Sequence, residues 1–166
     1  MGEITTVSAQ MREGLRRLAK AVVVVTSQRD GARYAMAATA VSEVSLDPPS
    51  LLICVNRNAS IHAPLAAGAD FCINILHSSQ ETISAACGGK LQGEVRFQQG
   101  AWAASESGLP YLEDAQANFM CRNERAIDHG THTIFIGEVT GVRTRGAVDP
   151  LVYVDGRYAV VGDQLT

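Results

Sequence analysis

"ATAVSEVSLDPPSLLICVNRNAS", residues 38–60, combines small residues, two adjacent prolines and an apolar run that ends in polar residues. Proline cannot donate to a strand ladder, so we expect residues 44–49 to form a bend rather than part of a central strand. The apolar run at 50–56 predicts a buried strand. Around it lie many Thr, Ser and Asn side chains with little charge, which indicates a surface that binds a polar group through hydrogen bonds.

Further strands are predicted on both sides of this stretch. β-Branched runs flank the turn "QRDG" and predict a hairpin, and apolar runs later in the chain predict strands of the same kind. In the last third, Asp155-Gly156 suits a type I′ turn, and two long strands are expected to meet around His129-Gly130. The predicted strands are 21–27, 32–41, 70–76, 115–128, 131–145 and a hairpin over 151–161.

Few segments have helical spacing. Met11, Leu15 and Leu18 predict an amphipathic helix that begins at Ser8 as its N-cap. Residues 60–68 are expected to be a short helix or turn, and 78–87 a helix capped by Ser78 or Ser79. Residues 88–112 mix glycine, polar residues and isolated aromatics, so we expect a loop with one helical turn, and loops of this length are often functional.

These elements predict one domain over residues 1–166, since the chain is short for two. Strands in meander order with few helices indicate a mainly β fold, a closed antiparallel barrel rather than alternating βαβ units.

Charge and hydropathy argue against a nucleic acid or a membrane as the partner of this chain. The net charge is −3 and no basic run is present, which argues against nucleic-acid binding. No apolar run reaches the ~20 residues of a membrane helix, and the first residues lack a signal-peptide pattern. We therefore expect a soluble, cytoplasmic protein that binds small molecules or proteins.

Metal and thiol chemistry are both disfavoured. The cysteines are widely spaced and mostly lie in apolar runs, so we expect reduced core thiols, with Cys87 as a packing residue. The nearest approach to a metal cluster is "DHGTH", residues 128–132. If the segment after Gly130 is extended, His129 and His132 would face opposite sides of a sheet, which disfavours a shared metal ion. The cysteines are Cys54, Cys72, Cys87 and Cys121.

Common catalytic motifs are missing, but a set of separate motifs resembles a known family. No dinucleotide-binding, phosphate-loop, nucleophile-elbow or zinc-protease motif is found. In contrast, "YAMAATAVSEVSLDPPSLLICVNRNAS", "FCINIL", Arg96-Phe97, "GTHTIFIGEV" and "PLVYVDGRYAVV" occur in an order that resembles the flavin-reductase-like split-barrel family. The similarity covers about residues 11–161. It is greatest to the small reductase components of two-component flavin monooxygenases of the 4-hydroxyphenylacetate or phenol hydroxylase type.

This resemblance implies an FMN-binding split β-barrel and an NAD(P)H:flavin oxidoreductase that uses NADH and FMN or FAD. Residues 38–42 would lie along the isoalloxazine, and residues near 56–60 would meet the ribityl and phosphate groups. His132 would help to seat the nicotinamide. The implied cofactor-binding residues are Ala38, Thr39, Ala40, Val41, Ser42, Asn56, Arg57, Asn58, Ser60, Arg96, Phe97, Gly130 and Tyr158.

Three positions depart from the family pattern. Ala35 stands where glycine is usual, Ala37 where threonine is usual, and Thr131 where an acidic residue is usual. The third lies in a tripeptide associated with nicotinamide cofactors, so the choice between NADH and NADPH stays open.

Alternatives also stay open. Taken alone, Thr39 and Ser42 are ordinary strand residues, His132 is a strand-end histidine, and Phe97 and Tyr158 are core or rim aromatics. A flavin carrier or sensor would need the same pocket, and the same barrel could reduce a corrinoid or ferric acceptor.

Partners are implied as well. An oxygenase component would receive the reduced flavin. A homodimer is expected because the long apolar strands, such as those at 21–25 and 70–76, leave few polar faces.

Overall fold

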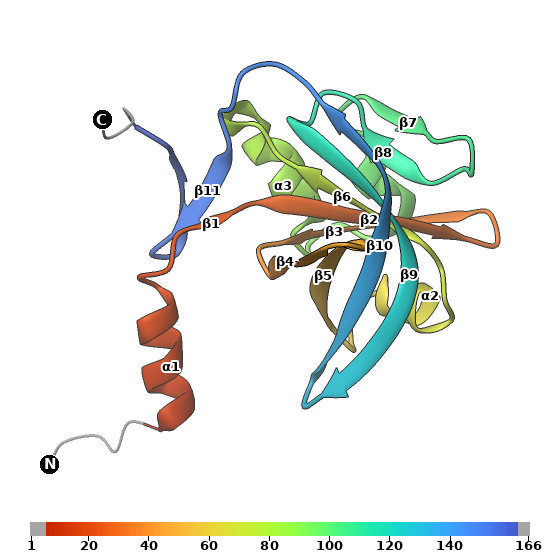
Figure 1. Ribbon diagram of the computed structural model, residues 1–166. Coiled ribbons are helices and arrows are strands. Elements are labelled where there is room, and N and C mark those ends of the chain that lie inside the picture. Colours follow the sequence, from red (N-terminus) through yellow and green to blue (C-terminus); the bar gives the residue numbers. More distant parts are fainter. Residues whose placement is uncertain (1–5, 163–166) are drawn as a thin grey trace, which may run out of the picture.

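A seven-stranded antiparallel sheet forms the centre of the computed structural model, which describes residues 6–162. Its strand order is β3-β2-β6-β9-β10-β5-β4 (Figure 1). The expected mainly β class with a few helices is confirmed. The strands of this sheet are β2 (Val23–Arg29), β3 (Ala32–Ala38), β4 (Val41–Leu46), β5 (Pro49–Asn56), β6 (Phe71–Ile75), β9 (Ala117–His129) and β10 (His132–Thr144).

The expected closure of this sheet into a barrel is not confirmed. β3 and β4 are its two edges, and no ladder joins them within residues 6–162. The predicted strand 32–41 instead ends at Ala38, and the chain turns away from β3 at Thr39 and Ala40. β4 then pairs with β5, with Val41 opposite Ile53. The sheet is therefore open between β3 and β4.

The valine run before the first hairpin is buried on both faces of the sheet. Val22 and Val24 belong to one apolar cluster, while Val23 and Val25 belong to another. Successive strand residues point to opposite faces, so a strand covered on both sides is apolar throughout rather than alternating. These strand faces are thus covered by the chain itself.

Helices cover the sheet on both faces. The helix α2 (His62–Ala66) contributes Leu65 to the cluster that contains Val23. The helix α3 (Glu81–Cys87) contributes Ile83 to the cluster that contains Val22. A 3₁₀ turn, η1 (Ser78–Gln80), precedes α3, and its cap is a reciprocal pair of His77 and Gln80. The expectation that Ser78 or Ser79 caps this helix is wrong.

The N-terminal helix α1 (Val7–Leu15) extends away from the central sheet (Figure 1). Its N-cap is Thr6, whose hydroxyl accepts from the Ala9 amide at 3.2 Å, so the predicted cap at Ser8 is two residues late. None of its residues is buried. Within residues 6–162, no helix is long and apolar enough to cross a membrane.

A three-stranded sheet lies beside α1. Its order is β1-β11-β12, with β1 (Lys20–Ala21), β11 (Leu151–Val154) and β12 (Arg157–Val160). Asp155 and Gly156 connect β11 to β12 with φ angles of 52° and 75°. Positive φ at both central residues is the signature of a type I′ turn, so that prediction is confirmed.

The double proline marks a shorter bend than expected. β4 continues to Leu46, and β5 begins at Pro49, so only Asp47 and Pro48 lie in the turn. Proline is tolerated as the first residue of a strand, which explains how Pro49 can begin an internal one.

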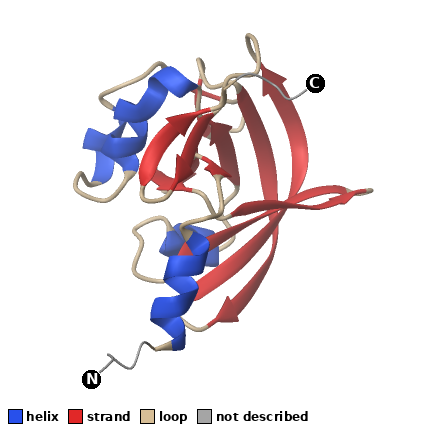
Figure 2. Cartoon of the chain, turned by 90° about the vertical axis from the view of Figure 1, so that its left-hand side faces the viewer, coloured by secondary structure: helices blue, strands red, loops and turns tan. Residues whose placement is uncertain are grey.

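The segment 88–112 holds more structure than a loop. It contains the expected helical turn, η2 (Gly93–Phe97), but also a small hairpin of β7 (Trp102–Ala104) and β8 (Pro110–Leu112). Asn74 anchors this hairpin, because its side-chain oxygen accepts from the Leu112 amide at 2.8 Å. Figure 2 shows one group of helices at the upper left and another below the centre, with the long strands curving along the right.

All four cysteines are free, as expected. Cys72, Cys87 and Cys121 are buried, and Cys54 is half-buried. Burial raises the pKa of the Cys87 thiol to about 11 and that of Cys121 to about 12, so both stay protonated near neutral pH. Cys87 lies in the same apolar cluster as Ile83 and Val22, a position typical of a packing residue.

Candidate functional site

The edge of β3 offers backbone groups to a ligand. Among the strands of residues 6–162, β3 pairs only with β2, so alternate residues have their N–H and C=O directed away from the sheet. The carbonyl of Ala35 is directed outward, because it accepts from the Arg96 guanidinium. The alternation of strand residues places the backbone groups of Ala37 on the same edge. A ligand along β3 could thus bind main-chain groups without any charge.

A pocket of about 260 Å³, here called the edge pocket, lies at the end of β3. Ala37 and Ala38 line it from the strand, Thr39 from the residue after the strand, and Tyr153 and Tyr158 from the hairpin β11–β12. The Tyr158 hydroxyl lies 2.9 Å from Ser84 Oγ, and the two tyrosine rings meet edge to face with centroids 5.5 Å apart. Three residues of the predicted site, Ala38, Thr39 and Tyr158, are therefore brought together.

A larger apolar hollow of about 670 Å³ opens on the other side of the β3–β4 connection. Residues 39–43 form part of its wall, so Thr39, Ala40, Val41 and Ser42 of the predicted site all line it. The rest of the wall is mainly apolar and includes Leu51, Leu52, Ile75 and Phe119.

The start of β3 lines a third pocket, of about 320 Å³, here called the arginine pocket. Arg33, Ala35, Ser60 and Arg96 contribute to it. Arg96 is buried, and its Nε donates to the Leu91 carbonyl at 2.7 Å. Its Nη1 donates to the Ala35 carbonyl. The other N–H groups of this permanently charged side chain stay available to an anion. Arg33, in contrast, pairs with Glu94 and lowers the pKa of that carboxyl.

Phe97 supports the arginine pocket from behind. It is buried, packs edge to face on Trp102 at 5.0 Å, and is covered by the Arg33 guanidinium at 4.1 Å. Phe97 does not line the arginine pocket itself.

The remaining predicted residues form a separate group, here called the tip cluster: Asn56, Arg57, Asn58, Gly130 and His132. They lie where β5 ends against the turn between β9 and β10. His132 is directly opposite Asn56 in the ladder, and the Arg57 amide donates to the Thr131 carbonyl at 3.0 Å. None of the five lines the edge pocket, the apolar hollow or the arginine pocket.

Local hydrogen bonds shape the tip cluster. The Asn56 side chain accepts from the Asn58 amide at 2.8 Å, and the Arg57 guanidinium pairs with Asp128 at 3.2 Å. Gly130 has a φ of 55°, which turns the chain tightly at Gly130 and Thr131 rather than at His129-Gly130. His132 Nδ1 lies 2.9 Å from the Thr131 hydroxyl, so its ring is held at the exposed end of β10.

The expected orientation of the two histidines here is wrong. His129 and His132 are directly opposite each other in the β9–β10 ladder, because the chain reverses between them. Directly opposite residues share a face of the sheet. Even so, residues 6–162 contain no group of three or more metal-binding side chains.

Sequence reasoning missed several pocket residues. Arg33 and Tyr34 line the arginine pocket, and Tyr153 the edge pocket. Tyr153 and Tyr158 are directly opposite in the predicted hairpin, so its register could have revealed Tyr153.

The donor set fits a flavin. An uncharged strand edge with small side chains suits a flat ring that must approach the backbone closely, and a buried arginine at one end of that edge suits a phosphate. These features follow β3 and the residue after its end, from Ala35 in the arginine pocket to Thr39, which lines the edge pocket with Tyr158.

Comparison with known proteins shows the family of the chain. The flavin reductase like domain family matches residues 15–162. The FMN reductase (NADH) RutF of Agrobacterium fabrum is 42% identical over 154 residues, which are 93% of this chain and 88% of that protein. The reductase component of an FADH(2)-dependent resorcinol hydroxylase from Rhizobium sp. is 38% identical over 157 residues, 92% of this chain and 86% of its own.

A solved structure of similar fold carries both kinds of nucleotide. The NADH:FAD oxidoreductase SgcE6 of Streptomyces globisporus, in complex with NAD and FAD fragments, superposes with a TM-score of 0.87 at 28% identity. The match covers 97% of this chain and 98% of that one.

Proposed function

The chain belongs to the flavin reductase like domain family, and on that premise we propose that it is an NAD(P)H:flavin oxidoreductase. It transfers hydride from NADH to FMN or FAD and supplies the reduced flavin to a partner oxygenase. The observation that carries this proposal is the open edge of β3, where uncharged backbone groups run from a buried arginine to a tyrosine-lined pocket.

The chain's own residues bind and orient the reactants. The flavin ring supplies the hydride acceptor, so no acid or base side chain is required for that step. The backbone at residues 37–42 holds the ring edge and stabilises negative charge there. Arg96 and Ser60 bind the phosphate, and Tyr158 closes the edge pocket against water.

We further infer that the working unit is a homodimer in which a split barrel is completed. Met11 and Leu15 form the apolar face of α1, and Leu18 follows the end of the helix, yet the three side chains are 62%, 42% and 53% exposed. A nine-residue helix is marginal in water by itself, so this face needs a partner. The adjacent apolar hollow, which Leu18 also lines, suits a second copy better than solvent does.

The separated tip cluster supports the same arrangement. His132 and Arg57 do not line the pockets along β3 of their own chain. A two-fold partner would bring its own tip cluster to the edge pocket and would place His132 of the partner subunit beside the nicotinamide. The soluble, cytoplasmic setting and the lack of nucleic-acid binding stay predictions from the sequence.

The test is turnover with excess free flavin. Catalytic amounts of protein with NADH and excess FMN or FAD should oxidise NADH steadily, and anaerobic spectra should show the flavin bleaching. A carrier or sensor would bind flavin without steady NADH consumption. A reductase of corrinoid or ferric acceptors would instead need those acceptors for turnover, and either result would overturn the proposal.

A further inference from the structure

A fourth pocket, here called the helix pocket, lies between α1 and the β11–β12 hairpin. It has a volume of about 230 Å³. Arg12 and Arg16 line it from the helix, Lys20 from β1, and Tyr153 and Asp155 from the hairpin. Three cations and one carboxylate thus surround it in a chain whose net charge is −3.

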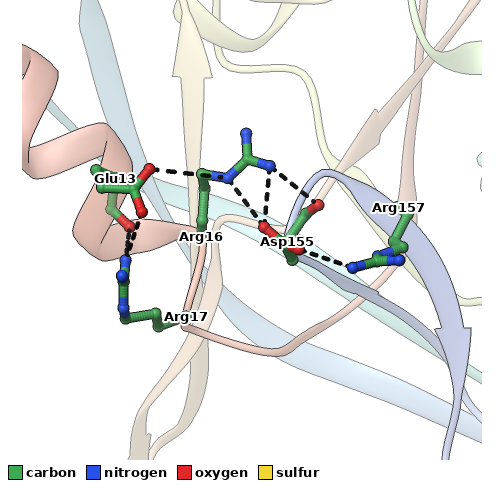
Figure 3. A network of polar contacts seen from close by, with 5 residues as sticks. All are labelled: Glu13, Arg16, Arg17, Asp155 and Arg157. Atoms are coloured by element: carbon green, nitrogen blue, oxygen red, sulfur yellow. Dashed lines mark hydrogen bonds and ion pairs between the residues drawn. The ribbon is translucent and has the colours of Figure 1, made fainter.

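The wall of the helix pocket is held by a network of ion pairs (Figure 3). Arg16 Nε donates to Asp155 Oδ1 at 2.9 Å, and Arg157 approaches Asp155 Oδ2 at 2.8 Å. The Asp155 amide in turn donates to the Arg16 carbonyl at 2.9 Å. Glu13 pairs with Arg17 at 2.8 Å and with Arg16 at 4.0 Å. The network fixes the end of α1 against the hairpin.

Two cationic side chains that line the helix pocket, Arg12 and Lys20, lie outside this network. Arg16 and Arg157 both pair with Asp155, and Arg17 pairs with Glu13, whereas Arg12 and Lys20 make no ion pair within residues 6–162. Lys20 is directly opposite Tyr153 in the β1–β11 ladder, so these two side chains lie on the same face. Both charges are therefore available to an anion in the helix pocket.

The helix pocket adjoins the proposed flavin site. Thr39 and Tyr153 line both the helix pocket and the edge pocket. The arginine pocket lies toward the other end of β3, about four residues or ~13 Å along the strand. The same edge is thus cationic at both ends, with an uncharged middle.

We propose that the helix pocket binds the diphosphate of the nicotinamide dinucleotide, with Arg12 and Lys20 as its phosphate ligands. This inference rests on the proposed function. A hydride donor must place its nicotinamide on the flavin ring, so its charged diphosphate must lie off the ring yet close to it. Arg96 at the far end suits the flavin phosphate, and the helix pocket is the cationic site next to the ring.

The test removes both charges and compares two hydride donors. Arg12→Gln with Lys20→Gln should raise the KM for NADH roughly five- to thirtyfold, the size expected for two partly exposed ion pairs. Dihydronicotinamide riboside, which lacks phosphate, should react with the same kcat/KM as in the unaltered protein. The FMN dissociation constant, from fluorescence titration, should stay unchanged.

A matched control carries the same change in net charge. Arg125→Gln with Arg143→Gln removes two exposed cations from β9 and β10 and should leave the KM for NADH near its original value. A second readout needs no turnover: calorimetric titration with NAD⁺ should give weaker binding for the Arg12 and Lys20 variant only.

Failure of the helix-pocket proposal and failure of the proposed function give different results in these experiments. An unchanged KM and unchanged NAD⁺ binding in the Arg12 and Lys20 variant would overturn the helix pocket while leaving the reductase standing. An equal loss with dihydronicotinamide riboside, or a loss of FAD binding alone, would also overturn it. If the unaltered protein reduces no flavin with either donor, the proposed function fails, and the NAD⁺ titration still tests the pocket.

Discussion

His132 lies at the tip of the β9–β10 hairpin, opposite Asn56 and beside the Thr131 hydroxyl. At the scale of single residues, its position is informative because it is exposed and away from the pockets along β3 of its own chain. A histidine that only ends a strand would have no effect on turnover, whereas one that seats a nicotinamide would.

We expect His132→Ala to slow NADH-dependent flavin reduction or raise the KM for NADH, with flavin affinity nearly intact. The reason is that His132 is placed on the nicotinamide side of the ring, where it binds the donor and not the flavin. Stopped-flow reduction at several NADH concentrations, with a parallel flavin titration, measures both quantities. An equal loss of flavin binding would place His132 on the wrong side of the ring, and full activity would make it a strand-end histidine.

At the scale of elements, the packing of β10 against side chains of β6 and β9 depends on the absence of a side chain at Gly137. A Cβ at Gly137 would lie 2.6 Å from the Phe71 ring and 2.8 Å from Cys121 Cβ. Phe71 and Cys121 are both buried in the same cluster, so neither can move aside cheaply.

Gly137→Ala is therefore expected to destabilise the fold by about 1–3 kcal/mol, the usual cost of overpacking a core. Chemical denaturation monitored by circular dichroism gives the difference in the free energy of unfolding. Gly141→Ala is the control on the same strand, because a Cβ there would meet only Met120 atoms at 3.8 Å or more. Equal stability of the two variants would contradict the close approach.

The elements also show how far the sequence could be interpreted. The hairpin turn at Asp155-Gly156 and the two long strands were predictable because turn chemistry and hydrophobic patterns are local. The hairpin β7–β8 was not, since Asn74, distant in sequence, anchors it at Leu112. Likewise, the family resemblance implied only some residues of the two pockets, such as Arg96 and Tyr158, and missed Tyr153. The helix pocket joins Arg12 to Asp155, which no local pattern connects.

At the scale of the whole molecule, the surface that a homodimer would cover differs from the one that the sequence predicts. The apolar strands that first suggested it are covered by the chain's own clusters, as the alternation of Val22 and Val24 with Val23 and Val25 shows. The surface that still needs cover is the face of α1 and the apolar hollow beside it. A partner there would also lie against the edge strand β4, whose residues Val41, Ser42 and Glu43 line the hollow and whose free edge otherwise invites unspecific pairing.

Sedimentation at micromolar concentration should therefore give about twice the chain mass, and dilution that separates the subunits should weaken flavin retention.

Met11→Glu with Leu15→Glu should shift the protein toward monomer, because two carboxylates would have to be buried in the interface. Val142→Glu with Val148→Glu is the matched control, since these residues are 54% and 88% exposed on other parts of the surface. If both double variants stay dimeric, the face of α1 is not the interface. If the unaltered protein is a stable monomer that reduces flavin at full rate, one chain must supply every group that the reaction needs, and the tip cluster would lose its proposed role across the interface.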